Sequence, residues 1–321
     1  MSVFREYLVD EYVDEYEHGR LSRRDALRYL VAIVGSATLA GAILAACTPP
    51  SRPASPPGGA TPTGAQPASA PSPTTALTDG SAIEAGPVQF AGQGVTLLGY
   101  LARPQGSGPF PALLVCHENT GLVEHIKDVT RRLAGAGYVS LAVDLLSREG
   151  GTESIRDGAR VPGTLSNTPN DQFAQDFQDA LGYLQGQQYV RGDRVGMVGF
   201  CFGGGVTWLV ASRIPSLGAV VPFYGPLPMP AGELRNVGAA VLAIYGERDR
   251  LTGGIPAIEA AMGQYGKTFD KVVYPNAGHA FLNDTRAGSY NADAAREAWA
   301  RMLAWFERYL KDDAAAGPYA Y

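Results

Sequence analysis

A cysteine lies at the centre of the most reactive segment of the chain, Gly199-Phe200-Cys201-Phe202-Gly203. The segment follows the apolar run 194–198, and its spacing is that of a nucleophile elbow, a sharp turn from strand to helix. Glycines two residues before and after the tip relieve the crowding that a Cβ would create. The following helix would direct its free N–H groups at Cys201, which favours a thiolate and a developing oxyanion. The alternative is a buried cysteine in a glycine-rich turn.

Three further polar residues, Glu118, Asp249 and His279, each follow an apolar run that is typical of a strand. In α/β sheets, reactive side chains gather outside the carboxyl ends of the strands. His279 would take the thiol proton and later return it to the leaving group, and Asp249 would orient the imidazole. Glu247 competes with Asp249 for that role, and a single loop His or Asp can also be an ordinary solvated residue.

An oxyanion hole and a modulating carboxylate are also indicated. The backbone N–H of Phe202 and a second donor from Asn119, in the loop after 112–116, would stabilise the oxyanion. Glu118 next to the nucleophile would raise the cost of a thiolate by like-charge repulsion. It would then hold Cys201 as a thiol until something displaces the carboxylate, unless Glu118 is an ordinary loop glutamate.

The elements that must position these residues belong to an α/β fold. From about 81 to 311, apolar β-rich runs alternate with helical patterns, which predicts a mostly parallel sheet with helices on both faces. Expected strands are an opening hairpin over 88–90 and 94–102, then 112–116, 139–143, 194–200, 219–223, 240–245 and 271–274. Expected helices are 124–136, 171–184, 202–211, 256–265 and 292–310.

Several motifs in this region resemble the dienelactone hydrolase family of α/β-hydrolases. They are His117-Glu118-Asn119-Thr120-Gly121-Leu122, Gly199-Phe200-Cys201-Phe202-Gly203-Gly204, Phe223-Tyr224-Gly225, Tyr245-Gly246-Glu247-Arg248-Asp249 and Gly278-His279-Ala280-Phe281. The resemblance covers a domain at 81–313. It implies hydrolysis of a small ester or lactone by a Cys201–His279–Asp249 triad through an acyl-thioenzyme, with no metal or other cofactor. It also implies that Glu118 contacts the thiol in the resting state.

The substrate pocket departs from the family pattern. The best-known family members hold the substrate carboxylate with arginines, one of them four residues after the histidine, where this chain has Asn283. Arg286, Arg148 and Arg156 are other possible cations. Tyr224 follows the strand after the elbow helix and could line the pocket or simply pack there. A broad-specificity carboxylesterase, a catalytically idle surface lipoprotein that binds a ligand, and a peptidase of related fold are the alternatives.

The first 80 residues carry a different signal. Residues 22–27 resemble a twin-arginine motif, an uncharged apolar stretch follows over 30–46, and Leu44-Ala45-Ala46-Cys47 resembles a bacterial lipobox. We therefore expect an export signal over 1–47, cleavage before Cys47 and a lipid on its thiol. The domain would be anchored to the cell envelope outside the cytoplasm. An uncleaved membrane anchor is the alternative, since the stretch is at the short limit for a span.

Two segments, one after the signal and one at the C-terminus, are expected to lie outside the folded domain. Residues 48–80 are rich in Pro, Ala, Ser and Thr, which predicts a disordered linker, and 314–321 form a short tail.

At the N-terminus, Phe4, Leu8, Tyr12 and Tyr16 recur every four residues. This spacing predicts an amphipathic helix within 1–19, which we expect to be a solvated segment ahead of the signal.

Composition excludes several other classes. The net charge of −5, without a basic patch, argues against a nucleic-acid partner. The three cysteines, Cys47, Cys116 and Cys201, cannot form a disulfide framework, and we expect Cys116 and Cys201 to be free thiols. No Cys/His spacing is typical of a metal site. A small ester or lactone is the expected partner, and a monomer the expected state.

Overall fold

The computed structural model describes residues 2–47 and 82–311. The predicted linker over 48–80 and the tail over 314–321 lie outside the described residues.

Within the described residues, eight strands form one sheet in the order β1-β2-β4-β3-β5-β6-β7-β8. Their bounds are β1 Ile83–Gly92, β2 Val95–Pro104, β3 Phe110–Cys116, β4 Val139–Asp144, β5 Val190–Phe200, β6 Ala219–Phe223, β7 Ala240–Gly246 and β8 Phe269–Tyr274. The β1–β2 and β2–β4 pairs are antiparallel, and the other five pairs are parallel. The expected opening hairpin and mostly parallel sheet are confirmed.

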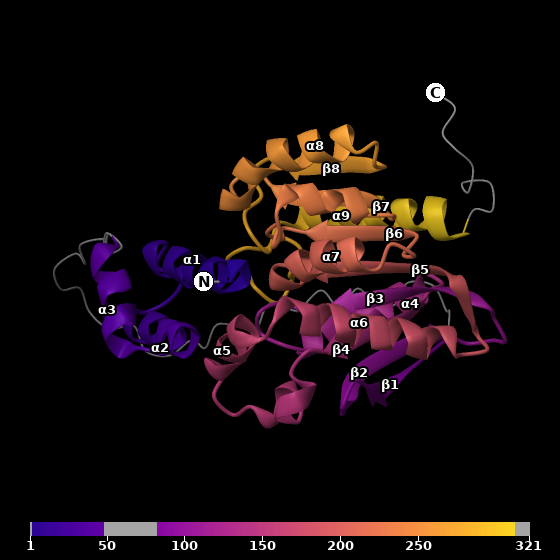
Figure 1. Cartoon of the computed structure of the whole chain (residues 1–321), viewed down its shortest axis with the longest axis horizontal. Helices are drawn as coiled ribbons and strands as arrows, with labels where there is room; N and C mark the ends of the chain where they lie inside the picture. The colour runs from indigo at the N-terminus through magenta and orange to yellow at the C-terminus, as the bar shows by residue number, and fades with distance from the viewer. Residues whose placement is uncertain (1, 48–81, 312–321) are drawn as a thin grey trace, which may run out of the picture.

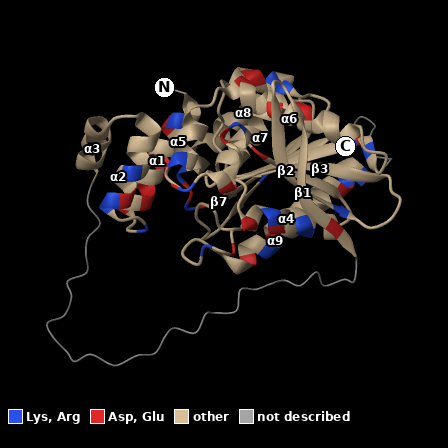
Figure 2. Cartoon of the chain, turned by 90° about the horizontal axis from the view of Figure 1, so that it is seen from below, with Lys and Arg blue, Asp and Glu red and all other residues tan. Residues whose placement is uncertain are grey.

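Helices cover both faces of this sheet. In Figure 2, α6, α7 and α8 lie on one face, while α4 and α9 lie on the other. The helices of the domain are α4 Glu124–Gly135, α5 Arg160–Asn167, α6 Asn170–Gln185, α7 Phe202–Arg213, α8 Ile255–Gln264 and α9 Ala292–Phe306, with a π-helical turn at Glu307–Lys311. Strands β3, β4, β6 and β7 are buried almost throughout, which explains their continuous apolar runs.

The strand that leads to Cys201 lies in the middle of the sheet. β5 pairs with β3 on one side and β6 on the other, and Cys116 lies opposite Gly199 in the register. Because parallel neighbours end at the same edge, the loops after β3, β5 and β6 converge there. The sheet therefore brings the predicted elbow and the Glu118 loop together.

Three N-terminal helices lie at the left of Figure 1: α1 Val3–Glu17, α2 Arg23–Val34 and α3 Ala37–Ala46. Helices α1 and α2 pack against the domain, and α3 packs against α2. The predicted N-terminal helix exists, but the expectation that it is solvated is wrong. Phe4, Leu8, Tyr12 and Tyr16 are all buried. The four-residue spacing indicated an apolar face, and α2 and the α/β domain together cover it, with Tyr12 stacked on Tyr29 of α2.

The apolar stretch over 30–46 does not form a single helix. It is divided between α2 and α3 by Gly35, whose φ of 74° is left-handed and ends α2. Among the described residues, no helix is both long and apolar enough to cross a membrane.

The turn around Cys201 depends on close backbone packing, which gives the first prediction. A Cβ on Gly203 would overlap the carbonyl oxygen of His117, which is backbone and cannot rotate away. We expect Gly203→Ala to lower the free energy of unfolding by at least about 2 kcal/mol in urea denaturation, the usual size of overpacking. Gly182→Ala is the control, because Gly182 is exposed in α6 with no atom near its Cβ position. It should stabilise by about 0.5–1 kcal/mol. Equal effects of the two changes would contradict this account.

Candidate active site

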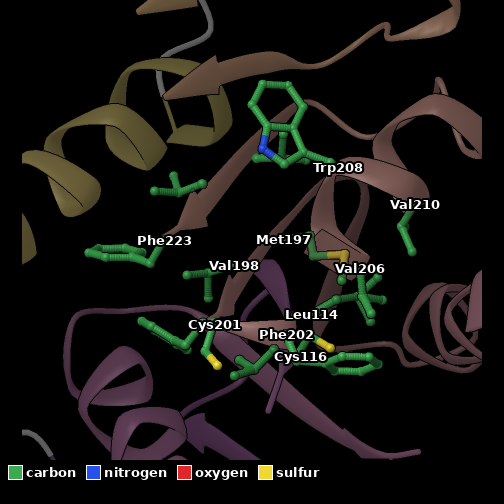
Figure 3. Close-up of a cluster of buried hydrophobic side chains, with 14 of the residues drawn as sticks. Leu114, Cys116, Met197, Val198, Cys201, Phe202, Val206, Trp208, Val210 and Phe223 are labelled. Atoms are coloured by element: carbon green, nitrogen blue, oxygen red, sulfur yellow. The ribbon is translucent and has the colours of Figure 1, made fainter. Parts of the chain in front are cut away.

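Cys201 occupies a strained turn between β5 and α7. Its φ of 58° and ψ of −121° are rarely adopted by a residue with a side chain. Backbone hydrogen bonds hold the turn: the N–H of Cys201 donates to Phe223 O at 3.1 Å, and its carbonyl accepts from Gly204 N at 2.9 Å. Strain of this kind costs about 1–3 kcal/mol and clusters at functional sites. Figure 3 shows Cys201 at the end of its strand, with Phe202 and Cys116 beside it.

Asp249 and His279 form a tightly coupled pair. Nδ1 of His279 lies 2.7 Å from Oδ2 of Asp249, and the other carboxylate oxygen accepts from Leu251 N at 3.0 Å. Asp249 is buried and its position is fixed by the 3-10 turn Arg250–Gly254 that it caps. The competing Glu247 is exposed and accepts from Asn276 N instead. Asp249 therefore orients the imidazole and sets its tautomer.

The N-terminal helix contributes two side chains to the same place. The Tyr7 hydroxyl lies 3.1 Å from Sγ of Cys201 and 3.3 Å from Nε2 of His279, and so bridges the two groups. A Glu11 oxygen lies 3.6 Å from the same nitrogen. Sequence analysis missed both residues. The signal that could have found them is the helical face, because Tyr7 and Glu11 lie three and seven residues after Phe4 on the buried side of α1.

Charges around His279 set its protonation. Burial lowers the pKa of His279, but the carboxylates of Glu11 and Asp249 and the Cys201 thiolate outweigh this, and the net pKa is well above the usual value. Burial and the same negative groups raise the pKa of Tyr7, so its phenol keeps its proton and can donate it. The site thus favours an imidazolium with a neutral phenol against it.

Glu118 is fully buried in the loop after β3, but its recorded partner is not the thiol. Its Oε2 accepts from Nδ2 of Asn283 at 2.9 Å, and its Oε1 has no hydrogen-bond partner among the described residues. Asn283, expected in the pocket, therefore positions Glu118. The contact to Sγ that the family resemblance implied for Glu118 is made here by Tyr7.

Tyr224 is buried and packs against the rings of His279 and Phe281. It has a φ of 37°, and its ring lies 5.1 Å from that of His279 and 5.6 Å from that of Phe281. Its buried hydroxyl has no hydrogen-bond partner among the described residues. Burial first, then the charges of Glu118 and Cys201, raise its pKa well above 10. The Tyr224 phenol therefore keeps its proton.

The two expected oxyanion donors follow neighbouring strands, β3 and β5. Phe202 is the first residue of α7, so its N–H has no acceptor within the helix. Asn119 is buried in the loop after β3, where Gly121 takes a left-handed φ of 84°. Both loops lie at the carboxyl edge of the β3–β5 pair, where an oxyanion on the carbon attached to Sγ would develop.

The other cysteines and His117 lie in surroundings that are typical of structural residues. All three cysteines are free, as predicted for Cys116 and Cys201, and burial raises the pKa of Cys116 well above its usual value. His117 accepts from Leu145 N through Nε2 and ties the loops after β3 and β4 together. Burial lowers its pKa, which suits a neutral ring.

A polar cavity of about 520 Å³ opens beside His279, and its lining includes Glu11, Arg248, Arg250 and Arg286. Burial lowers the pKa of Arg286, but the charges of Glu118 and Cys201 outweigh it and keep the guanidinium protonated. Of the other arginines considered from sequence, Arg148 forms a two-point ion pair with buried Asp176. Of the arginines considered from sequence, Arg286 is thus the one that lines this cavity.

One set of three possible metal ligands occurs among the described residues: Glu11, Cys201 and His279, with ligand atoms within 4.8 Å of one another. Spacing in the sequence did not indicate it, because Glu11 comes from the N-terminal helix. Two of these groups belong to the Cys–His pair, and the Tyr7 hydroxyl already contacts both.

The charge coupling at His279 gives the second prediction. Because its folded pKa is raised above the unfolded value of about 6.5, protonated His279 stabilises the fold in full below that pH and progressively less as pH rises through the folded pKa. Asp249→Asn should lower the His279 pKa by about one unit or more, measured by NMR titration of the ring. Glu247→Gln removes a nearby exposed charge and should leave it unchanged. A similar fall in both variants would contradict the assignment.

Comparisons with known proteins place this geometry in a family. Residues 97–310 match the model of the "Dienelactone hydrolase family". A "Putative carboxymethylenebutenolidase" of Methylorubrum extorquens is 38% identical, over 74% of this chain and 85% of that protein. One of the same name from Escherichia coli K12 is 34% identical, over 77% of this chain and 95% of that protein.

A solved structure agrees with these sequences. The crystal structure of a "Putative Dienelactone Hydrolase" from Klebsiella pneumoniae has a TM-score of 0.66 and 34% identity, and covers 71% of this chain and all of that one. The helices α1 to α3 lie outside the family match. The chain belongs to the dienelactone hydrolase family, and it is a hydrolase of the α/β-hydrolase fold.

Proposed function

We propose that this hydrolase cleaves small esters or lactones with a Cys201–His279–Asp249 triad, through an acyl-thioenzyme. The observation that carries the proposal is the coupling of three groups from three strand ends. Cys201 lies at a strained elbow, a ring nitrogen of His279 lies within 4.8 Å of its Sγ, and Asp249 holds the other nitrogen at 2.7 Å.

The chemistry follows from these positions. His279 Nε2 takes the proton of the Cys201 thiol, and Sγ attacks the carbonyl carbon, so that the π electrons move onto the carbonyl oxygen. The N–H groups of Phe202 and Asn119 stabilise that oxyanion. Its collapse breaks the C–O bond, and His279 returns the proton to the leaving oxygen. A water then attacks the thioester, again deprotonated by His279, and releases the acid and the thiol.

Glu118 modulates the thiol in this proposal. Its carboxylate is buried near Cys201 and is held by a single amide, that of Asn283, with one oxygen unpaired. An unpaired buried carboxylate oxygen is costly, which favours its movement toward any donor that enters the site. On substrate binding, Glu118 would leave Asn283, and its charge would favour the imidazolium that forms when His279 takes the thiol proton.

The proposed substrate is a small anion such as a dienelactone, in keeping with the names of the relatives. Half-buried Arg286 lines the cavity beside His279 and would bind the substrate carboxylate. A broad carboxylesterase would not need this cation, and an idle ligand-binding protein would not need the triad. Assays of Cys201 and Arg286 variants therefore distinguish the three functions.

We also propose that the chain is exported and lipidated on Cys47. Arg23 and Arg24 are exposed at the start of α2, where a receptor for the twin-arginine motif could bind them. Cys47 is half-buried at the end of α3, directly after Ala46, and the segment that follows is rich in proline. The free thiol thus lies at a boundary that a lipobox peptidase would cut.

The nucleophile is tested by Cys201→Ala, with Cys116→Ala as the matched buried-thiol control. We expect loss of at least about 10³-fold in kcat on cis- or trans-dienelactone in Cys201→Ala, since the covalent step is removed. Cys116→Ala should stay within about threefold. Equal rates in wild type and Cys201→Ala would favour an idle binding protein. Turnover of p-nitrophenyl acetate without lactone turnover would favour a general esterase.

The cation is tested by Arg286→Gln against Arg248→Gln. Both residues line the same cavity, but Arg248 is exposed and donates to Asn276. Arg286→Gln should raise KM for the anionic lactone about tenfold or more, since a charge-assisted hydrogen bond is lost, and leave KM for neutral p-nitrophenyl acetate unchanged. Arg248→Gln should change neither. Equal losses on both substrates would show that Arg286 does not select the anion.

Lipidation is tested in a bacterium that processes lipoproteins. We expect the wild-type chain to incorporate labelled palmitate, to migrate as a shorter product and to fractionate with membranes. Cys47→Ser should abolish all three, because the lipid is attached to that thiol. Unprocessed full-length wild type in the membrane fraction would favour the retained anchor instead.

A further inference from the structure

The nucleophile of this hydrolase is closed off from solvent by the N-terminal helix. Cys201 is 3% exposed, and the hydroxyl that lies against its sulfur belongs to Tyr7 of α1, which comes 194 residues earlier in the chain. Tyr7 is itself 3% exposed and its phenol also contacts Nε2 of His279. A substrate carbonyl cannot reach Sγ while this ring is in place, because both need the same space.

The surface of the catalytic domain accommodates the helix that carries Tyr7. Phe4 packs against Phe173 and Phe202, with ring centroids 5.7 and 4.7 Å away. Gly163 leaves room for α2, since a Cβ there would lie 2.7 Å from Ala32 O. A Cβ on Gly205 would lie 2.9 Å from the Phe4 ring, and equally close to Pro226 of the domain. The surface of the domain is therefore shaped to receive α1 and α2.

Polar contacts also hold α1 over the site. Arg250, which follows the triad aspartate, donates to the backbone oxygen of Tyr7 at 3.1 Å and lies over its ring at 5.3 Å. The same guanidinium lies 3.6 Å from Glu11 and 3.4 Å from Asp10. A residue adjacent to the triad thus binds the helix that covers the triad.

The Tyr7 oxygen lies at the position expected for the leaving-group oxygen of an ester. In ester cleavage, the leaving oxygen is bonded to the carbon that Sγ attacks and receives its proton from Nε2 of the histidine. An oxygen 3.1 Å from Sγ and 3.3 Å from Nε2 is where such a leaving group would lie. A phenol resembles the enol that leaves from an enol lactone. Tyr7 therefore competes directly with substrate.

We propose that α1 is a lid that closes the active site with Tyr7 in the place of the leaving-group oxygen, so that substrate enters only when α1 withdraws. The proposal rests on the proposed function of Cys201 and His279. It makes the closed chain a resting form, whose apparent kcat/KM is reduced by the fraction of time that α1 is open. A peptidase cut before Cys47 would remove the lid altogether.

The first test uses the full-length chain and a thiol reagent, so its outcome does not depend on the identity of the substrate. Tyr7→Ala shortens the blocking side chain, and Glu6→Ala is the matched control, because Glu6 is exposed on the same helix. The rate of iodoacetamide labelling is measured at Cys201 by peptide mass spectrometry, with half-buried Cys47 as the internal standard. Tyr7→Ala should label Cys201 at least about tenfold faster than wild type and Glu6→Ala.

Hydrolysis of p-nitrophenyl acetate by the same proteins separates the lid from a catalytic role for Tyr7. If α1 is a lid, kcat/KM should rise in Tyr7→Ala in step with labelling, and Tyr7→Phe should give a smaller rise because the ring remains. A fall in kcat/KM with unchanged labelling would overturn the proposal and make Tyr7 a catalytic residue. Faster labelling without hydrolysis in any variant would support the lid and refute the proposed function.

A second measurement keeps the wild-type sequence, in case Tyr7→Ala fails to fold. An acetamide group on Sγ of Cys201 must take the space of the Tyr7 phenol. Amide hydrogen exchange in α1 should then be at least about tenfold faster in the labelled protein than in the unlabelled one, while α6 keeps its protection. Equal protection of α1 in both would show that a group can enter beneath it, and would overturn the lid.

Discussion

The site depends on a backbone approach that admits no side chains. Cys201 can adopt a φ of 58° at the end of β5 because Gly199, Gly203 and Gly204 let the turn lie directly against neighbouring strands and loops. A Cβ on any of the three would overlap backbone atoms, from Gly203 itself, from His117 or from Phe223. The hydrogen bond from Cys201 N to Phe223 O then fixes the tip relative to β6. The other contacts of Cys201 therefore depend on the fixed position of this turn.

Charge at the site is balanced between elements that are far apart in sequence. His279, exposed Arg250 and half-buried Arg286 have the charge opposite to that of the buried carboxylates of Asp249, Glu11 and Glu118. Burial penalises the three carboxylates, and neighbours of the opposite sign offset that penalty. Removal of α1 would take Glu11 away and leave the histidine with one carboxylate fewer. The lid therefore affects the electrostatics of the catalytic pair as well as its access.

Much of the fold and of the site could be predicted from the sequence. The apolar runs located the parallel strands, since burial on both faces requires such runs, and the glycine spacing located the turn at Cys201. Asp249 was placed by its position after a strand, and the structure brings it to His279. Short α5 was missed, because Pro162 and Gly163 lie within it and are typical of loops.

The contacts between distant segments could not be predicted. The pair Glu118–Asn283 joins two loops that lie 165 residues apart, and no local pattern records such a pairing. The periodicity of α1 showed that one face would be buried but not what would bury it. Because residues 1–47 were interpreted as an export signal, the domain was not considered as that surface. Tyr7 and Glu11 were thus found only once the helix was seen over the triad.

Gly163 has a consequence for related chains. The three atoms nearest to its Cβ position all belong to Ala32 of α2, whose carbonyl oxygen would lie 2.7 Å away. In a chain without N-terminal helices these atoms would be absent, and a side chain could fill the position. The absence of a Cβ at position 163 is therefore an imprint of docked α2 on the domain. Gly205 differs, because Pro226 of the domain also lies within 3.0 Å of its Cβ position. The residue that replaces Gly163 in a related sequence would indicate whether its domain has a surface for such a helix, even where the N-terminal segments have diverged.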